Sequence, residues 1–337
     1  MIVVKVGSQS WKFNNSVFLL ETGTAVGSLE SQGPLKDDFD IVYDDPYCGQ
    51  KSWEQAESQL MRSAIHQALT KAQLKENDVS VAFAGDLVNQ IVPTHYTFRE
   101  MNIPFFGVYG ACSTAMESLL LSSIFIDSDS AKIALAATSS HNSSAERQFR
   151  NPTEYGGPKP ETAQYTVTGS GVALVSHKRT KIRIESGTVG FIVDAAQKNP
   201  LDMGSAMAPA AAQTIKQHFE DLGVEPSYYD LILTGDLARC GSPILIDILK
   251  QEGYDISQQH NDCGKLIFSE DQPVFAGGSG CACCAVVTYG HIKKLLEEKK
   301  LKRVLVVATG ALLNPLIVQQ KETIPCIAHA VALCAED

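Results

Sequence analysis

Three short apolar runs in the first half of the chain have the length and composition of buried β-strands. They span residues 79–84, 105–109 and 131–137. Upstream of them, Ser52 opens a segment whose apolar residues recur at helical spacing, and Gln55 stands at the capping-box position. The expected buried face of this helix consists of Ala56, Leu60, Ala64, Ala68 and Leu69.

The second of these strands runs into Gly110, Ala111 and Cys112, and an apolar helix follows. We expect Ser113 and Thr114 to cap the first turn of that helix. This geometry would place the Cys112 sulfur at the positive end of a helix, where amides and the macrodipole favour the thiolate. The alternative is a buried cysteine that only packs in a strand–helix turn. The apolar face of the helix contains Met116, Leu119 and Leu120.

The second half of the chain repeats this order of elements. The apolar strand within 230–237 parallels the strand at 79–84, and the glycine-rich stretch 275–283 parallels the Cys112 turn. The interval before the glycine-rich turn is longer in the second half, so we expect an insertion of about one hairpin at 251–271. The remaining counterparts are a strand at 304–310 and helices at 207–222 and 286–296.

Two copies of alternating strands and helices predict a duplicated α/β fold, with two mixed sheets and helices between and outside them. We expect an N-terminal half at 1–178, which carries the Cys112 turn, and a C-terminal half at 179–337. In such a fold the ligand pocket lies where strand ends from both halves converge. The loops expected there are 110–112, 140–142, 235–236, 278–280 and 310–314.

Composition and charge narrow the class of protein. The chain has 337 residues, of which 44% are hydrophobic and 20% charged, so it can bury a sizeable core. A formal net charge of -10 argues against nucleic-acid binding and against simple electrostatic docking on an anionic membrane. No apolar run reaches the roughly 18 residues that span a bilayer, and the N-terminus lacks the apolar region of a secretory signal. Any membrane role is therefore expected to depend on partners.

Nine cysteines are scattered through apolar segments, and their odd number suggests free thiols in a reducing compartment. Cys281, Cys283 and Cys284 stand close together, but their neighbours are Gly, Ala and Val, and the paired spacing of a zinc site is missing. We expect these three to pack as small apolar residues, and we expect no metal site and no cofactor.

A polar stretch at 143–165 is expected to form a loop. It carries two arginines, Arg147 and Arg150, and the acidic residues Glu146 and Glu154. Either arginine could face a ligand, or both could be solvated loop charges that pair with the neighbouring carboxylates.

A duplicated α/β chain with a cysteine on this turn resembles the thiolase and ketoacyl synthase superfamily, whose fold has five layers in the order αβαβα. The resemblance covers nearly the whole chain and is closer to one family, the stage V sporulation AD proteins of spore-forming bacteria. The resemblance implies binding of dipicolinic acid (pyridine-2,6-dicarboxylate) and its calcium chelate, in support of uptake into the developing spore. The motifs that carry it lie at 110–114, 139–141, 145–150, 166–169 and 277–281.

The same resemblance implies membrane proteins of the spore dipicolinate channel as partners. It places the protein in the cytoplasm or peripherally on the spore inner membrane. Members of the superfamily are commonly dimeric, so a homodimer is also implied.

Relatives that condense thioesters pair the cysteine with a His and an Asn, or with two His, from loops of the second half. At the corresponding places this chain has Thr-Gly-Asp at 234–236 and Gly-Ser-Gly at 278–280. Asp236 at that site is expected to repel a developing enolate oxyanion. His141, or His260 with Asn261, could substitute from other loops, because acyl transfer needs an oxyanion donor and a base.

We therefore expect a binding protein that has kept the pocket of the fold and lost its chemistry. Cys112 stands at the nucleophile position, but we assign no residue a catalytic role. Two alternatives remain: a condensing enzyme or acyltransferase that uses Cys112, and a scaffold in a membrane assembly whose pocket is vestigial. The candidate ligand-binding residues are Cys112, Ser113, His141, Arg147 or Arg150, Asp236 and Ser279, with Tyr109 or Phe106 against the aromatic ring.

Overall fold

The computed structural model describes residues 4–13, 16–149 and 159–336. The sheet of the N-terminal half has the strand order β3-β9-β7-β5-β6, and β4 pairs with the outer part of β3. The bounds of these strands are β3 (Phe18–Gly27), β4 (Ile41–Tyr43), β5 (Val81–Gly85), β6 (Phe105–Gly107), β7 (Ile133–Ser140) and β9 (Gly169–Ser176).

The sheet of the C-terminal half has the order β12-β11-β14-β15-β10, and an N-terminal hairpin of β1 and β2 adds to β10. The bounds are β1 (Val4–Val6), β2 (Ser10–Lys12), β10 (Ile182–Val189), β11 (Leu231–Thr234), β12 (His260–Asp262), β14 (Arg303–Ala311) and β15 (Cys326–Ala335).

The two sheets repeat the same pattern of strand directions, which confirms the predicted duplication. In each sheet three parallel strands, β6-β5-β7 or β12-β11-β14, are followed by two antiparallel ones. The sheets touch at one pair of residues, Arg183 of β10 and Phe18 of β3, so backbone pairing connects all 13 strands into one large mixed sheet. A separate short pair joins β8 (Tyr165–Thr166) to β13 (Gly278–Ser279).

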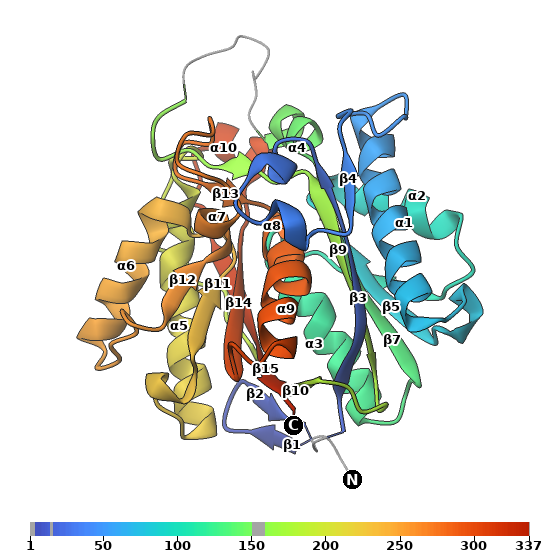
Figure 1. Ribbon diagram of the computed structural model, residues 1–337. Coiled ribbons are helices and arrows are strands. Elements are labelled where there is room, and N and C mark those ends of the chain that lie inside the picture. The colour runs from blue at the N-terminus through green and yellow to red at the C-terminus, as the bar shows by residue number, and fades with distance from the viewer. Residues whose placement is uncertain (1–3, 14–15, 150–158, 337) are drawn as a thin grey trace.

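The helices cover both outer faces and fill the space between the sheets, as Figure 1 shows. α1 and α2 lie outside the N-terminal sheet, α5 and α6 lie outside the C-terminal sheet, and α3 lies between them with α8 and α9. This is the predicted five-layered arrangement. The bounds are α1 (Trp53–Ala72), α2 (Val92–Arg99), α3 (Thr114–Asp127), α5 (Met203–Leu222), α6 (Ala238–Gln251), α8 (Cys281–Val286) and α9 (Lys293–Glu297).

Three shorter helices lie near the carboxyl ends of the parallel strands, at the top of Figure 1: α4 (Asn142–Phe149), α7 (Cys263–Leu266) and α10 (Pro315–Gln319). Single turns of tighter or wider helix complete the chain. They are η1 (Glu30–Gln32), η2 (Lys36–Asp38), η3 (Glu76–Asp78), η4 (Asn89–Ile91), η6 (Pro226–Tyr228) and the π-helical η7 (Val287–Ile292). Among the described residues, no helix is both long and apolar enough to cross a membrane.

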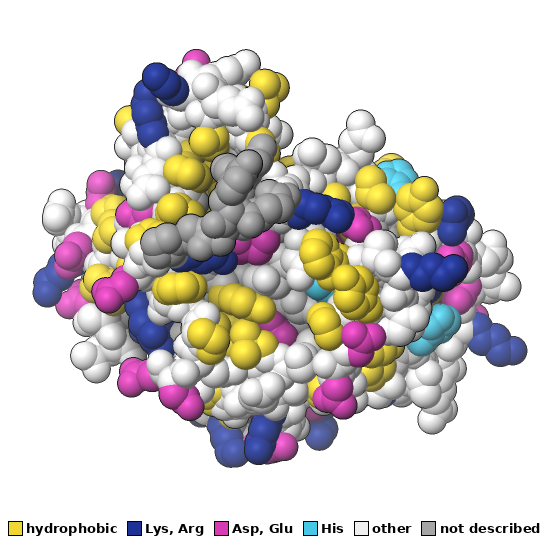
Figure 2. Space-filling model, turned by 90° about the horizontal axis from the view of Figure 1, so that it is seen from above, with side chains coloured by type: hydrophobic (Ala, Val, Ile, Leu, Met, Phe, Trp, Pro, Cys, Tyr) yellow, Lys and Arg dark blue, Asp and Glu magenta, His cyan; other side chains and the backbone are white. Residues whose placement is uncertain are grey.

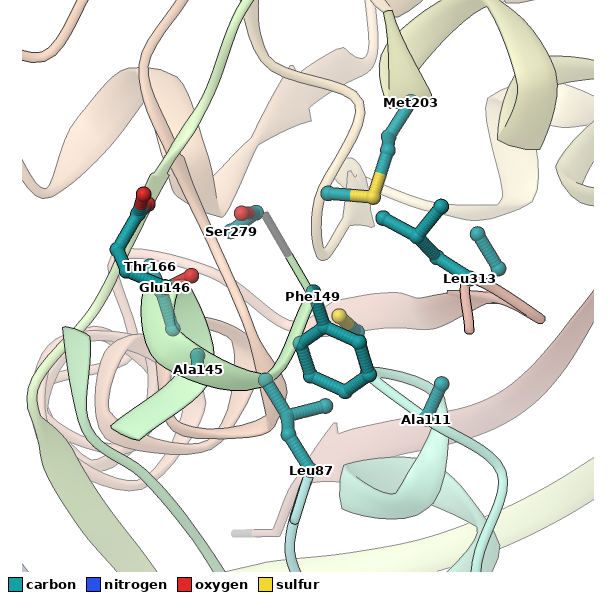
Figure 3. A pocket seen from close by; sticks show the side chains of 11 residues that line it. Leu87, Ala111, Ala145, Glu146, Phe149, Thr166, Met203, Ser279 and Leu313 are labelled. Carbon is teal, nitrogen blue, oxygen red and sulfur yellow. The ribbon is translucent and has the colours of Figure 1, made fainter. Parts of the chain in front are cut away.

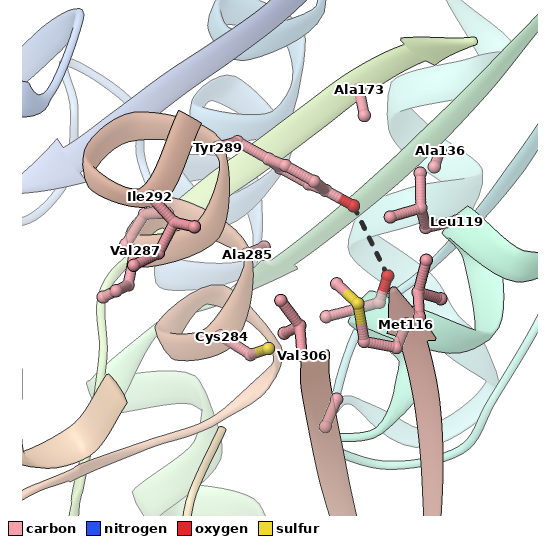
Figure 4. Close-up of a cluster of buried hydrophobic side chains, with 14 of the residues drawn as sticks. Met116, Leu119, Ala136, Ala173, Cys284, Ala285, Val287, Tyr289, Ile292 and Val306 are labelled. Carbon is pink, nitrogen blue, oxygen red and sulfur yellow. Dashed lines mark hydrogen bonds between the residues drawn. The ribbon is translucent and has the colours of Figure 1, made fainter. Parts of the chain in front are cut away.

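Helix α1 forms as its sequence predicts. The Ser52 hydroxyl accepts from the Gln55 amide at 3.3 Å, and every residue of the expected apolar face is buried. Between the sheets, Met116 and Leu119 of α3 lie opposite Cys284 of α8, and the Tyr289 hydroxyl donates to a backbone carbonyl of α3 at 3.5 Å (Figure 4). Cys281, Cys283 and Cys284 are fully buried, so their predicted role as small packing residues is confirmed.

Two local predictions are wrong. The segment 251–271 is not an inserted hairpin, because it contains β12, which pairs in parallel with β11 as β6 pairs with β5. β12, rather than the stretch before Cys281, is therefore the counterpart of the β6 strand. The polar stretch that begins at residue 143 is not all loop, because its first part forms the helix α4.

Candidate functional site

The turn that carries Cys112 is held by hydroxyl groups. The Ser113 hydroxyl donates to the Gly110 carbonyl at 2.6 Å, and the Thr114 hydroxyl donates to the Ala111 carbonyl at 2.7 Å. Neither side chain caps the amides of α3, so the predicted capping role is wrong. The hydroxyls instead stabilise a tight turn in which Ala111 has the left-handed φ of 52°.

Cys112 is a buried, neutral thiol. Burial raises its pKa well above the usual value, and the nearby Asp236 adds to this effect. The amides of Gly280 and of Cys112 itself offset only part of the change. The predicted thiolate is therefore wrong, because loss of water outweighs the field of the helix terminus.

This result predicts slow alkylation of Cys112. In the native protein at neutral pH, iodoacetamide should modify Cys112 more slowly than the partly exposed Cys240, because both access and thiolate population are lower. Peptide mass spectrometry after timed exposure measures both rates in one sample. Faster labelling of Cys112 would contradict a protonated, enclosed sulfur.

Loops of both halves meet at this turn, as predicted. A Cβ built on Gly310 would lie 2.0 Å from the Gly110 carbonyl oxygen, so the end of β14 is in direct backbone contact with the Cys112 turn. The Cys281 thiol donates to the Ala111 carbonyl at 3.1 Å. From the N-terminal half, the Ser140 hydroxyl accepts from the Ala282 amide at 3.2 Å.

A narrow cavity opens beside the Cys112 sulfur, with a volume of about 30 Å³. Phe149 lies in the middle of its lining, between Leu87 and Met203, and Ser279 and Glu146 face it from the other side (Figure 3). We call it the Cys112 cavity. Its lining residues are Leu87, Ala111, Cys112, Ala145, Glu146, Phe149, Thr166, Met203, Ser279, Ala311 and Leu313.

Of the predicted ligand-binding residues, the structure brings Cys112 and Ser279 to this cavity. Ser279 is 1% exposed, and its hydroxyl has no hydrogen-bond partner among the described residues. Ser113 and Asp236 are buried behind the lining and do not contact the cavity.

His141 and Arg147 are engaged elsewhere. The Nε2 atom of His141 lies 2.8 Å from the Pro46 carbonyl, its Nδ1 accepts from an amide, and burial lowers its pKa. Arg147 pairs with Glu54 and lies over the Trp53 ring, 5.4 Å from the ring centre. The alternative arginine, Arg150, and the acidic Glu154 lie outside the described residues.

The remaining candidates do not line the cavity either. His260 Nε2 lies 2.9 Å from the Thr234 hydroxyl, and burial lowers its pKa to about 4. Phe106 stacks on Phe83 at the sheet edge, with ring centres 5.4 Å apart. Tyr109 lines a neighbouring cavity, and the side-chain oxygen of Asn261 accepts from the following amide.

Asp236 differs from its predicted role. It is fully buried, and burial together with nearby thiol and carboxyl groups raises its pKa well above the usual value, while the backbone amides of Gly280 and Thr309 offset only part of this change. A neutral carboxyl group carries no charge to repel an oxyanion and can itself donate a hydrogen bond. The argument against catalysis that assumed an Asp236 charge is therefore wrong.

Two more buried carboxyls stand next to lining residues of the cavity: Glu57 accepts from Ser144, the neighbour of Ala145, and Asp86 precedes Leu87. Burial raises the pKa of Glu57 well above its usual value, with Asp86 adding to the effect, although two serine hydroxyls donate to Glu57. Burial also raises the pKa of Asp86 to about 6, despite bonds from the Thr94 amide and hydroxyl. The surroundings of Cys112 are thus acidic rather than basic.

Several residues that line the cavity were not predicted from the sequence. Phe149 and Ala145 stand four residues apart, which is helical spacing, but the polar composition around them concealed the helix α4. Thr166 reaches the cavity because β8 pairs with β13, opposite Ser279. Met203, in the first turn of α5, had no signal in the sequence. No three His, Cys, Asp or Glu groups of the described ranges are arranged to hold a metal ion.

Comparisons with known proteins agree with this architecture. The sequence profile of the family described as Stage V sporulation protein AD matches residues 7–334. The Stage V sporulation protein AD of Bacillus subtilis (strain 168) is 58% identical over 325 residues, which cover 96% of each chain.

Solved structures with the same fold include 3-oxoacyl-[acyl-carrier-protein] synthase III from Aquifex aeolicus VF5. It has 14% identity and a TM-score of 0.55, and the match covers 94% of this chain and 99% of the synthase. OleA of Xanthomonas campestris, in a crystal structure with bound cerulenin, has 12% identity and a TM-score of 0.59, with 95% of this chain and 98% of OleA covered. At this identity the likeness concerns the fold alone.

Proposed function

The chain belongs to the stage V sporulation protein AD family and so has a role in sporulation, and from this premise we propose that it is a non-catalytic binding protein for dipicolinic acid and its calcium chelate. The ligand site is the Cys112 cavity. The function of the protein would be to support uptake of dipicolinic acid into the developing spore.

The observation that carries the proposal is the Ser279 hydroxyl. It lines the cavity, it is almost fully buried, and it has no partner among the described residues. A buried polar group without a partner costs free energy, and a ligand oxygen that accepts from it would remove that cost. A ligand carboxylate supplies such an oxygen.

The charges around the cavity favour the calcium chelate over the free dianion. The lining contains the Glu146 carboxylate and, among the described residues, no Lys, Arg or His. Lys159 pairs with Glu146 at 3.0 Å, which leaves no excess positive charge at this wall. Burying a dianion here is unfavourable, whereas the chelate is neutral overall and its calcium can accept a carboxylate oxygen of Glu146.

The apolar side chains of the cavity can pack against a flat aromatic ring, but some of them must first move to make room for it. Leu87, Phe149 and Leu313 are apolar, and Met203 is a flexible side chain that adapts to a ligand. A volume of about 30 Å³ holds roughly two water molecules, which is less than the ring requires. Binding therefore requires the side chains of Phe149 and Met203 to turn outward.

Ser279→Ala should weaken binding of calcium dipicolinate about tenfold, because it removes one hydrogen bond to a charged acceptor. Calorimetric titration of the purified chain measures this, with calcium or with a chelator present and with benzoate as a control ligand. Ser186→Ala is the matched variant, since Ser186 is another buried hydroxyl without a partner among the described residues and lies away from the Cys112 cavity.

Unchanged affinity in Ser279→Ala would remove this hydroxyl from the site. Equal affinity for the ligand with and without calcium would contradict the preference for the chelate. No binding of either form would overturn the proposed function.

The catalytic alternative is tested on the same protein. A condensing enzyme would carry an acyl group on Cys112 after incubation with acyl-CoA, visible as a mass shift that Cys112→Ala removes. The neutral thiol and a lining without His or Asn among the described residues support the non-catalytic proposal.

Partners complete the proposal. We place membrane proteins of the spore dipicolinate channel next to this chain, which would hold it peripherally at the spore inner membrane. A homodimer is also proposed, supported by β6, whose outer edge pairs with no other strand of the described residues and whose Phe106 is 55% exposed.

A further inference from the structure

A second cavity lies on the other side of the Cys112 turn. Its volume is about 210 Å³, and among the described residues it shares only Ala111 and Ala311 with the Cys112 cavity. Both halves of the chain contribute to its walls, which are mostly apolar. Tyr109, Ile192, Leu312, Pro325 and Ile327 line it together with Glu117 and His329. We call it the Glu117 cavity.

Glu117, in the first turn of α3, is the polar group of this cavity that lacks a partner. Its Oε2 atom is buried and has no hydrogen-bond partner among the described residues. The atom packs against Gly110, where a built Cβ would lie 2.7 Å from it. Burial raises the pKa of Glu117 to about 6, so the group is mostly ionised at neutral pH. A carboxylate oxygen in this position calls for a donor.

The cavity lining does not supply a positive charge. No Lys or Arg of the described residues lines it. His329 does line it, but burial lowers its pKa to about 4, and its Nδ1 accepts from the Gly190 amide at 3.3 Å. The other titratable groups at the lining are the Tyr109 hydroxyl and the Cys326 thiol, and burial raises the pKa of both. No group of the described lining therefore supplies a counter-charge for the Glu117 carboxylate.

The rim of the cavity suits an apolar cation. Tyr109 is 43% exposed and lines the same cavity as Glu117, and the face of an aromatic ring attracts an organic ammonium group. Ile192 is 72% exposed and Leu312 is 49% exposed. Apolar side chains gather on this end of the molecule, as Figure 2 shows. Such a patch on a protein surface commonly marks a binding site.

We propose that the Glu117 cavity binds a small protonated amine with an apolar body. The ammonium group pairs with the Glu117 carboxylate, and the apolar body lies against Ile192 and Leu312. This site is separate from the proposed dipicolinate site, so either proposal can fail alone. Because both cavities share Ala111, an amine bound here contacts the backbone turn that carries Cys112.

The test uses two probes with similar bodies and opposite charges, 2-phenylethylamine and 3-phenylpropanoate, titrated into the full chain by calorimetry or ligand-observed NMR. We expect the amine to bind and the carboxylate not to bind. Glu117→Gln should weaken amine binding at least tenfold, because it removes the charge and keeps the shape. Glu146→Gln, which changes the carboxyl of the other cavity, should leave amine binding unchanged. Affinity should also fall between pH 7 and pH 5, as Glu117 becomes protonated.

Equal binding of the two probes would overturn the proposal. So would an unchanged amine affinity in a Glu117→Gln protein that unfolds at the wild-type temperature, or no amine binding at millimolar concentration. A dimer that Ile192→Glu converts to a monomer, with amine binding in the monomer alone, would show that a second copy of the chain covers the cavity. That outcome would also overturn the proposal.

Discussion

Gly310→Ala is expected to destabilise the protein by about 3 kcal/mol and to abolish binding in the Cys112 cavity, although it adds one methyl group. Gly310 lies in β14, where a built Cβ would be 2.0 Å from the Gly110 carbonyl oxygen and 3.1 Å from the Ser113 amide nitrogen. These are backbone atoms and cannot rotate away. The methyl group must therefore push the two halves apart at the turn that carries Cys112. Urea unfolding measures the loss of stability, and calorimetry with calcium dipicolinate measures binding.

Gly49→Ala is the matched control. Gly49 has a φ of 72°, and no heavy atom lies within 4 Å of its built Cβ. An alanine there meets only the backbone cost of the left-handed region, about 1 kcal/mol, and lies away from the ligand. If Gly310→Ala unfolds like Gly49→Ala and still binds ligand, the contact between the end of β14 and the Cys112 turn does not position the site.

The parts of the fold that the sequence predicted are those whose signals are local. Helix α1 has its cap at Ser52 and its apolar face within 20 residues, so neither depends on distant partners. The strands β5 and β7 are short apolar runs buried on both faces, and such runs have few alternatives in an α/β chain. The duplication followed because the same local signals occur twice in the same order.

The elements that were missed depend on distant pairing. β12 is the tripeptide His260-Asn261-Asp262, which has no apolar pattern and is a strand because β11 lies beside it. Helix α4 has a mostly polar sequence, and its only apolar residues, Ala145 and Phe149, line the Cys112 cavity together with Glu146. Intrinsic preference is a weak guide where tertiary contacts decide the conformation.

At the site, too, features with local signals could be predicted and features that depend on distant residues could not. The position of Cys112 could be predicted from the strand, the small residues and the helix around it. Its charge state could not, because the raised pKa of the thiol comes first from burial and then from the nearby Asp236, which is far away in the sequence. The partners of Arg147, Glu54 and Trp53, lie almost a hundred positions earlier in the sequence. The orientation of the Arg147 side chain could therefore not be predicted either.

A further consequence of this interior is that its titratable groups are stable mainly in their neutral forms. Burial lowers the pKa of His218 to about 3 and raises the pKa of Glu30 to about 7. A buried imidazole with a lowered pKa opposes protonation, so it reduces stability as the pH falls. A buried carboxyl with a raised pKa opposes ionisation, so it reduces stability as the pH rises. The two windows overlap between about pH 4.5 and 6.5, so the two contributions oppose each other there, and the His218 contribution is measured as a difference between the wild type and a His218 variant.

His218, which is fully buried, should contribute a loss of stability as the pH falls. Its Nδ1 lies 2.7 Å from the Thr188 hydroxyl and its Nε2 lies 2.6 Å from the Tyr229 hydroxyl. The unfolded chain binds a proton at this residue below its usual pKa of 6.5, whereas the folded chain does so only near pH 3. Between pH 7 and pH 4.5 the difference amounts to about 3 kcal/mol of lost stability, since one pKa unit corresponds to about 1.4 kcal/mol.

Urea unfolding at a series of pH values measures this loss. His218→Gln should be less stable than the wild type at pH 7, because one glutamine cannot replace both hydrogen bonds, yet it should lose less stability on acidification. His66→Gln, at an exposed position of α1, is the control and should keep the wild-type slope, because it leaves His218 and its two hydroxyl partners unchanged. If the free energy of unfolding fell equally with pH in the wild type and in His218→Gln, His218 would be protonated inside the fold without cost. The hydroxyl groups that now hold its neutral ring would then have to reorient to accept from an imidazolium.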